Sequence, residues 1–413
     1  MIISIAWKNV WRNKWRSLVV ISAMSVGLLG GIFYLAFSNG MAQQQINDSI
    51  KSYVSNIQIH NPKYLINSEI KYTIPSYKKI IDGIKQLPEV EAVGSRIVSQ
   101  AMASSAVTGA GIIINGIEVE NEKKLTDIYL NLDDGTYFET KLRTPVIIGR
   151  KLADKLKVKV HSKIVVTLQN LEGEITYGAF RVAGIYKTTN TAYDGINIFV
   201  KKKDLADLIG MNYKNETTEI AVLLKHNNMT KSVLQKLNET FENEVMNKKL
   251  VIRSWNQIQP TLEMLNEMTI QFSFFFVIII LTALSFGIVN TMLMAIMERT
   301  REIGMLLAIG MSRARLFFMI MTETVMLSMT GGIIGLLLSW LTIAITGETG
   351  IDLSIVAEGL NSWGYSSFVY PEIDAKFYFL IGGLVIVTAM LASVYPARRA
   401  LKMNPAEAVR HEA

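Results

Sequence analysis

The chain has 413 residues, of which half are hydrophobic and 19% are charged, and its mean hydropathy is positive. This composition excludes an average soluble protein, and the charged fraction excludes a purely intramembrane one. The net charge of +7 does not indicate nucleic-acid binding, because membrane topology accounts for the basic residues that flank the apolar segments. The chain has no cysteine, so we expect neither disulfides nor thiol chemistry.

Four long apolar segments predict four transmembrane helices. They cover residues 17–37, 270–297, 316–346 and 377–395, and each can cross a hydrocarbon core of about 30 Å, which needs about 20 residues. The first segment is longer than the apolar part of a signal peptide, and no small-residue cleavage site follows it. We therefore expect it to remain as a membrane anchor.

The placement of basic residues predicts the orientation. Lysine and arginine gather before the first span, between the second and third, and after the fourth, whereas residues 347–375 contain five acidic residues and no lysine or arginine. The positive-inside rule therefore places both termini and the short segment 298–315 in the cytoplasm. Residues of about 41–266 and the acidic loop are then outside.

The segments next to the first two spans are expected to be helical. Ile3, Trp7, Trp11 and Trp15 share one helical face of residues 1–16, which is typical of a helix in the headgroup region. Helix-compatible sequence continues from the first span to residue 52, giving a helix of about 54 Å at 1.5 Å per residue. Pro260 suits the first turn of a second long helix. These two helices would form a stalk that carries the outer domain.

The outer domain is predicted to contain two subdomains. Strand, helix and strand patterns recur at 56–60, 76–87 and 90–98, and again at 218–224, 231–244 and 250–255. Two such halves predict a split βαβ, ferredoxin-like subdomain made of residues 53–100 and 214–259. Residues 101–213 form a β-rich insertion, with strands expected at 111–117, 145–148, 163–168, 180–186 and 197–200. The predicted fold class is an α-helical membrane protein with an α+β extracytoplasmic domain.

The motifs of common enzymes are missing from the sequence. No Gly-Lys dipeptide occurs, so the chain has no P-loop to hold nucleotide phosphates, and no Gly-x-Ser-x-Gly nucleophile elbow is present. The four histidines are scattered without the spacing of a zinc site. We therefore expect no catalytic residue, no metal and no cofactor bound by this chain.

Polar side chains and pairs of glycines inside the spans indicate contacts between helices. Asn290 and Glu323 lie at similar depth in the second and third spans, so we expect them to hydrogen-bond, and helix packing is favoured over a proton relay. The pairs Gly27 and Gly31, and Gly331 and Gly335, permit close helix approach. Such pairs often indicate only packing within one chain.

The segment between the second and third spans is amphipathic. Glu298, Arg301 and Glu302 fall on one helical face, and Gly304 and Gly310 permit close approach or a sharp turn. The expected apolar side comprises Ile303, Leu306, Leu307 and Ile309. Amphipathicity alone is equally compatible with a simple connector that lies on the membrane surface.

Residues 298–310 (Glu-Arg-Thr-Arg-Glu-Ile-Gly-Met-Leu-Leu-Ala-Ile-Gly) closely resemble the coupling-helix signature of ABC-transporter permeases of the MacB/Lol/FtsX class. The tail, residues 395–400 followed by 404–408, resembles the same class, as does the arrangement of one span, a large outer domain and three spans. Asn404 also suits a helix N-cap with Pro405 in the first turn. The resemblance implies dimeric permeases and a separate cytoplasmic ABC ATPase in two copies, which binds the ATP and magnesium.

Within this class, the chain resembles the lipoprotein-releasing LolC/LolE-like branch in its length, in residues 57–64 and in the lack of a fused ATPase. This branch implies a bacterial inner-membrane protein that extracts lipoproteins from the outer leaflet. The alternatives are a MacB-like exporter of periplasmic peptides or drugs, and an FtsX-like signalling subunit that controls a cell-wall hydrolase. The last alternative implies a smaller outer domain than this chain has.

The resemblance also assigns candidate sites and partners. The residues expected to dock the ATPase are Glu298, Arg301, Glu302, Ile303, Gly304, Leu307 and Gly310. The residues expected to line a substrate gap between the first two spans are Met41, Ile46, Leu262, Leu265 and Met268. Further expected partners are a second permease copy or a paralogue, membrane lipids, an amphiphilic lipoprotein substrate and a periplasmic chaperone. Nucleic acid is not among them.

Overall fold

This computed structural model describes residues 7 and 11–402, which belong to two compact units. The described residues of the helical unit lie within Met1–Met41, Glu267–Asp352 and Phe368–Ala413, and the α/β unit comprises Ala42–Asn266 and Leu353–Ser367. The tail positions at 404–408 that resemble the permease class, including the predicted N-cap Asn404, lie outside the described residues, and so does Ile3.

Among the described residues, four helices are long and apolar enough to cross a membrane, which confirms the four predicted spans. They are α2 (Lys14–Ser49), α12 (Pro260–Glu298), α14 (Arg313–Thr349) and α16 (Ala375–Leu401). α12 begins at Pro260, as predicted, because proline lacks the N–H that a first turn leaves unbonded. α2 continues without a break into the π-helix η1 (Ile50–Val54), so the predicted extension beyond the first span is also present.

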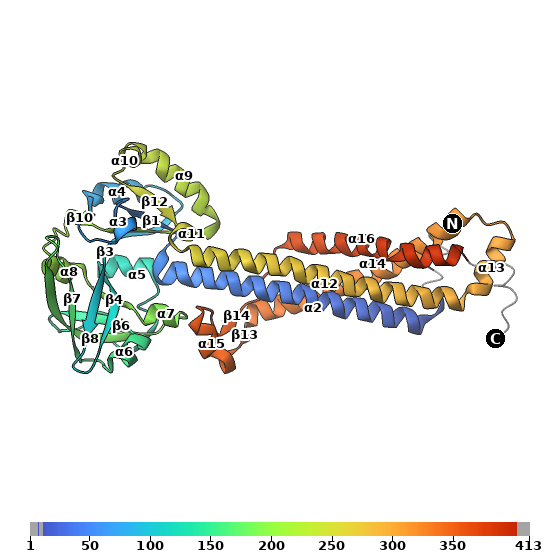
Figure 1. The fold of residues 1–413 in the computed structure, drawn as a ribbon, viewed down its shortest axis with the longest axis horizontal. Helices are drawn as coiled ribbons and strands as arrows, with labels where there is room; N and C mark the ends of the chain where they lie inside the picture. The colour runs from blue at the N-terminus through green and yellow to red at the C-terminus, as the bar shows by residue number, and fades with distance from the viewer. Residues whose placement is uncertain (1–6, 8–10, 403–413) are drawn as a thin grey trace. The chain divides into compact units, whose positions relative to one another are not determined.

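The core of the helical unit is built around glycines of α14. A Cβ atom added at Gly331 would lie 3.0 Å from Met24 Cβ, and one added at Gly335 would lie 3.0 Å from Leu28 Cβ, both on α2. The Ser25 hydroxyl donates to the Gly331 carbonyl at 2.9 Å. Figure 1 shows α2 and α12 alongside each other, and Gly31 of α2 lies directly against Ile280 of α12. Both glycine pairs therefore serve packing within this chain.

Replacing Gly335 by leucine should destabilise the helical unit by about 1–3 kcal/mol, because the added side chain must displace Leu28 and the backbone of α2. The matched control is Gly383→Leu, since nothing lies within 4 Å of a Cβ at Gly383 of α16. Both variants gain the same helix propensity. Thermal unfolding of the full-length chain in detergent measures the difference, and equal midpoints for the two variants would contradict this packing role.

One half of the α/β unit is the predicted split βαβ arrangement. The chain order β1 (Ile57–His60), α4 (Tyr77–Ile84), β3 (Val90–Ser104), then β11 (Glu219–Leu224), α9 (Thr230–Thr240) and β12 (Val251–Ser254) gives two such halves. Their strands lie in the order β12-β1-β11-β3 with every neighbouring pair antiparallel. Side chains of α4 and α9 cover one face of this sheet and form a shared apolar core.

The other half is a closed β-barrel. Its strands are β3, β4 (Gly109–Ile117), β6 (Pro145–Gly149), β7 (Lys163–Gln169), β8 (Ile175–Tyr186) and β9 (Asn197–Lys201). Pairing runs β3-β4-β9-β6-β8-β7, and β7 pairs back onto β3 through residues 102–104, which closes the ring. Fully buried Ile114, Val146, Ile164 and Val200 belong to its core. The predicted insertion is therefore β-rich, and the long strand β3 joins it to the ferredoxin-like half.

Short elements connect these strands. They are α3 (Tyr64–Asn67), β2 (Ile74–Pro75), α5 (Val119–Leu125), β5 (Leu132–Gly135), α6 (Arg150–Leu156), α7 (Thr191–Asp194), α8 (Lys202–Ile209), β10 (Glu216–Thr217), η2 (Asn227–Met229), α10 (Glu242–Met246) and α11 (Trp255–Ile258). The segment between α14 and α16 holds β13 (Ile351–Asp352), η3 (Ser354–Val356), α15 (Ala357–Ser362) and β14 (Phe368–Val369).

Lys202, the first residue of α8, is a buried amine of the α/β unit. Its Nζ donates to Ser95 Oγ at 2.6 Å and lies 3.4 Å from Glu118 Oε1. The ammonium also lies over the Tyr77 ring, 4.1 Å from its centre. Burial lowers the pKa of Lys202 from 10.5 to about 8, because removal from water disfavours the charged form.

As the pH is raised from 8 to 10.5, the free energy of unfolding of the wild type should increase relative to that of Lys202→Met. The folded state loses the Lys202 proton near pH 8 and the unfolded state near 10.5, so the unfolded state binds more protons in this window and unfolding becomes harder as pH rises. The ceiling is about 3 kcal/mol. Thermal unfolding midpoints of both proteins across this window measure the effect. A constant difference across the window would show that the amine titrates normally.

Candidate functional site

The segment between α12 and α14 forms a short helix, α13 (Thr300–Ala308). Arg299 stands between α12 and α13 with non-helical backbone angles, and Gly310 follows α13 with φ at 97°. Glycine is needed there because other residues are strained at positive φ. Ser312 then caps α14, its hydroxyl accepting from the Arg315 amide. These local signals place α13 as a separate helix between two spans.

The two faces of α13 have different surroundings. Ile303 is 5% exposed and belongs to the core of the helical unit, Gly304 is also buried, and Leu306 and Leu307 pack against that core. The opposite face is defined here as the outer stripe, and it is exposed. It comprises Arg301, Met305, Ala308 and Ile309, whose spacing is that of one helical face. Ile309 is 85% exposed and Met305 is 45% exposed.

The residues predicted to dock an ATPase are thus divided between the two faces. Glu298, Arg301 and Gly310 are exposed, whereas Glu302 and Leu307 are partly buried. Ile303 and Gly304 are buried inside the helical unit, so they cannot touch a partner in this conformation. The sequence analysis did not single out Met305 and Ala308, and it placed Ile309 on the apolar side with Ile303. In the structure all three are exposed on the face of Arg301.

Glu302 is bonded to the segment before α2. Arg12 donates through Nη1 to Oε2 at 2.9 Å and through Nη2 to Oε1 at 2.6 Å. This hydrogen bonding lowers the pKa of the Glu302 carboxyl and raises the pKa of Arg12. Both side chains are about half exposed, and exposed pairs contribute only about 0–1 kcal/mol. The pair therefore orients the N-terminal segment against α13 more than it stabilises the fold.

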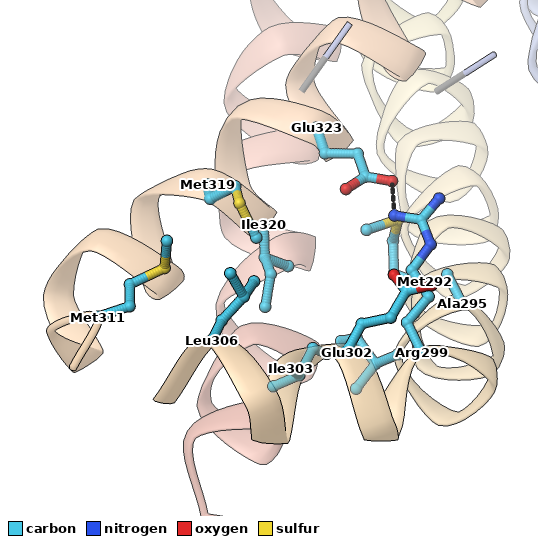
Figure 2. Close-up of a pocket in the computed structure, with 11 residues that line it drawn as sticks. Met292, Ala295, Arg299, Glu302, Ile303, Leu306, Met311, Met319, Ile320 and Glu323 are labelled. Atoms are coloured by element: carbon cyan, nitrogen blue, oxygen red, sulfur yellow. Dashed lines mark hydrogen bonds and ion pairs between the residues drawn. The ribbon is translucent and has the colours of Figure 1, made fainter. Parts of the chain in front are cut away.

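A buried ion pair ties the start of α13 to α14. Arg299 Nη1 donates to Glu323 Oε1 at 2.8 Å, and the side chains are 10% and 9% exposed. Figure 2 shows the two side chains pointing toward each other. The predicted partner of Glu323 was wrong, because Asn290 is exposed on α12. Arg299 bonds Glu323 instead, from its position at the junction of α12 and α13.

A cavity of about 170 Å³ lies behind α13, between α12 and α14. Figure 2 shows the Arg299–Glu323 pair on one side of it and mostly apolar side chains around the rest. The lining residues are Met292, Ala295, Ile296, Arg299, Glu302, Ile303, Leu306, Met311, Met319, Ile320 and Glu323. Close packing resists the displacement of a helix. Because this cavity lies behind α13, fewer side chains support α13 than support a fully packed core helix.

The predicted gap residues also have mixed surroundings. Ile46 is 5% exposed and packs with Ala92 and Leu223 in a core of the α/β unit, so it is a core residue rather than part of a gap. Leu262 is buried and Met268 is exposed, with Met41 and Leu265 between these extremes. A groove of about 340 Å³ between α2 and α12 lies elsewhere, along residues 19–27 and 280–291.

Within residues 7 and 11–402, no three histidine, cysteine or acidic side chains lie close enough together to hold a metal ion. The site thus combines an exposed helical face, a buried ion pair and a cavity with a mostly apolar lining.

Two family models match the chain. One, the MacB-like periplasmic core domain, matches residues 17–240, which is more than half of the chain, and the other, the FtsX-like permease C-terminal region, matches residues 274–405. The second match contains all of α13 and the ion pair.

Several relatives are similar along nearly the whole chain. The lipoprotein-releasing system transmembrane protein LolC of Buchnera aphidicola is 23% identical over 98% of this chain and 96% of its own length. An uncharacterised ABC transporter permease of Methanocaldococcus jannaschii is 24% identical, covering 100% of this chain and 98% of that protein. The pyoverdine export ATP-binding/permease protein PvdT of Pseudomonas savastanoi is 25% identical over 98% of this chain, which spans 59% of that protein.

The match over more than half of the chain, together with the four spans and the α/β unit, establishes the family and confirms the resemblance of the coupling segment. This chain belongs to the ABC transporter permeases of the MacB/LolC/FtsX type, with a MacB-like periplasmic core domain and an FtsX-like permease C-terminal region.

Proposed function

We propose that this chain is the membrane subunit through which a separate cytoplasmic ABC ATPase drives work on the periplasmic side, and that the ATPase holds the outer stripe of α13. The observation that carries this proposal is the split character of α13. Its inner face belongs to the same apolar core as the spans, while Met305 and Ile309 are exposed. Exposed apolar residues that recur on one helical face are typical of a partner-binding site.

The proposed orientation follows from charge. Arg299, Arg301, Arg313 and Arg315 surround α13, whereas residues 347–375 at the other end of α14 carry no lysine or arginine. The positive-inside rule then puts α13 in the cytoplasm and the α/β unit in the periplasm of a bacterial inner membrane. This chain contains no P-loop sequence, so ATP and magnesium would bind to the ATPase. The ATPase would be present in two copies.

The proposed output is motion carried by α2 and α12. Both helices run from the helical unit into the α/β unit without interruption, and an α-helix transmits displacement along its axis because every turn is hydrogen-bonded to the next. α12 also presents Phe272, Phe275 and Phe286 to the outside, a surface that lipid or a second permease copy, identical or paralogous, would cover.

The proposed cargo is a lipoprotein taken from the outer leaflet and passed to a periplasmic chaperone. Similarity to LolC along both chains supports this choice. Export of a periplasmic peptide or small molecule is the second candidate, and similarity to PvdT supports it. An FtsX-like signalling role remains the third, with the large α/β unit against it.

Purification of the full chain from its native membrane tests the proposal. We expect an ABC ATPase, and lipoprotein, to co-purify, and we expect ATP to release the lipoprotein. Release of a small molecule or peptide instead would favour the exporter, and a bound cell-wall hydrolase without cargo would favour signalling. ATP hydrolysis by the isolated chain, without any partner, would contradict the proposal outright.

A further inference from the structure

The end of the long helix α2 is bonded directly to the sheet of the α/β unit. The last carbonyls of a helix have no partner within the helix and carry its negative dipole end. Here the Tyr53 carbonyl accepts from Arg96 Nη1 at 2.9 Å, and the Val54 carbonyl accepts from Gln58 Nε2 at 2.7 Å. Arg96 lies on β3 and Gln58 on β1, so two different strands hold the helix end.

Arg96 is itself held by two carboxylates. It binds Glu122 of α5 through Nε at 3.0 Å and Nη2 at 2.7 Å, and it donates from Nη1 to Glu219 of β11 at 2.9 Å. The three side chains are 4%, 2% and 8% exposed. A buried guanidinium with four bonds in a fixed planar fork has little freedom to move.

His60 extends the same cluster across the sheet. Register places His60 opposite Glu219, and Glu219 opposite Arg96, on three neighbouring strands. The His60 ring nitrogens lie 3.1 Å from the Thr218 carbonyl and 2.9 Å from Gln58 Oε1. Gln58 therefore connects His60 back to the Val54 carbonyl, and the cluster reaches the helix end by two routes.

Asn56, just after the turn at Ser55, ties α12 to the same place. Its side chain accepts from the Leu224 amide of β11 at 2.8 Å and donates to Asn227 Oδ1 at 2.6 Å. Its carbonyl accepts from the Trp255 amide at 3.0 Å, at the start of α11. α11 ends at Ile258, two residues before α12 begins at Pro260. The sheet thus holds the end of α2 and η1 directly, and the segment before α12 is held through α11.

We propose that Arg96 is a positioning residue of a rigid joint, which comprises Tyr53, Asn56, Gln58, His60, Arg96, Glu122 and Glu219 and makes the α/β unit turn as one body with α2. This inference rests on the proposed function, in which α2 and α12 carry motion. Without the joint, the chain would bend at Ser55, where the backbone leaves the helix at a φ of 60°, and the displacement would be absorbed there.

The test compares Arg96→Lys with a matched control. Lysine keeps the positive charge but lacks the fork, so it cannot hold Glu122, Glu219 and the Tyr53 carbonyl together. The control is Lys202→Met, which removes another buried charge of the same unit that does not contact α2 or η1. Gln58→Leu is the second variant, because it cuts the bond to Val54 and leaves the Arg96 ion pairs intact.

The measurement is the distance between spin labels in the full chain, purified with its ATPase in lipid nanodiscs. The chain has no cysteine, so cysteines introduced at Gln43 on α2 and at Glu172 in the β7–β8 turn are its only labelling sites. Wild type and Lys202→Met should give a narrow distance distribution. Arg96→Lys should broaden the distribution about twofold, because lysine cannot hold Glu122, Glu219 and the Tyr53 carbonyl together. Gln58→Leu should broaden it less, because the bonds of Arg96 remain.

A second reading separates this inference from the proposed function. ATP should move a reporter on the α/β unit relative to the helical unit in wild type, and Arg96→Lys should lose most of that shift while the complex still hydrolyses ATP. If Arg96→Lys keeps the narrow distribution and the full shift, or if Lys202→Met broadens equally, the joint is refuted. A wild-type complex that shows no ATP-dependent shift would instead contradict the proposed function.

Discussion

Ile309→Asp should abolish co-purification of the ATPase while leaving the permease folded. Ile309 is 85% exposed at the end of α13, so an aspartate there costs the fold little. If this side chain enters an apolar pocket of the ATPase, a buried carboxylate would have no partner. Anchor residues of this kind contribute about 2–4 kcal/mol, which corresponds to a loss of affinity of about 30-fold to 900-fold. Met305→Asp should have a similar effect because Met305 lies one turn earlier on the outer stripe.

Two control variants separate docking from folding. Ser312→Asp adds the same charge three residues away, and aspartate still serves as an N-cap for α14, so its complex should remain intact. Ile303→Asp places a charge in the core of the helical unit and should lower the unfolding temperature instead. Affinity chromatography with ATPase quantified by mass spectrometry, beside thermal unfolding, gives both readings. An intact complex in Ile309→Asp would show that the outer stripe does not face the ATPase.

The contrast between Ile303 and Ile309 shows where sequence reasoning reached its limit. The amphipathic pattern and the coupling-helix signature correctly predicted a helix between the second and third spans. They did not reveal which apolar residues face the bundle, because both faces of α13 carry aliphatic side chains. That choice depends on the turn at Arg299 and on the positive φ of Gly310, which set the rotation of α13 against α12 and α14.

The sequence also did not predict which residues far apart in the chain contact each other. Composition predicted the four spans, and Pro260 predicted the start of α12, because both signals are local. Glu323 was correctly marked as a membrane acid in need of a partner, but counting residues gives depth along a helix and not the side of the helix that a residue such as Asn290 faces. Closure of the barrel through β3 and β7, and the meeting of Arg96 with Glu122 and Glu219, join positions far apart in the chain. Neither the closure of the barrel nor the Arg96 contacts produce a periodic pattern in the sequence.

Glu323→Leu should destabilise the helical unit by about 3–5 kcal/mol, because it removes the carboxylate from a buried guanidinium. Arg299 and Glu323 are each about one-tenth exposed and lie 2.8 Å apart beside the cavity behind α13. Glu323→Gln should cost less, about 1–2 kcal/mol, since the amide oxygen still accepts a hydrogen bond from Arg299. Unfolding of the full-length chain in mixed detergent micelles measures each loss.

The double variant Arg299→Met with Glu323→Leu decides whether the pair serves stability or geometry. Replacing a buried ion pair by apolar residues of similar volume is often neutral, so the double variant should recover most of the stability lost in Glu323→Leu. The control is Glu348→Leu, the same change at an exposed position of α14, which should cost almost no stability. If the ion pair orients α13, the recovered protein should still bind the ATPase less tightly than wild type. Full recovery of both stability and binding would mean that any well-packed contact at this place suffices.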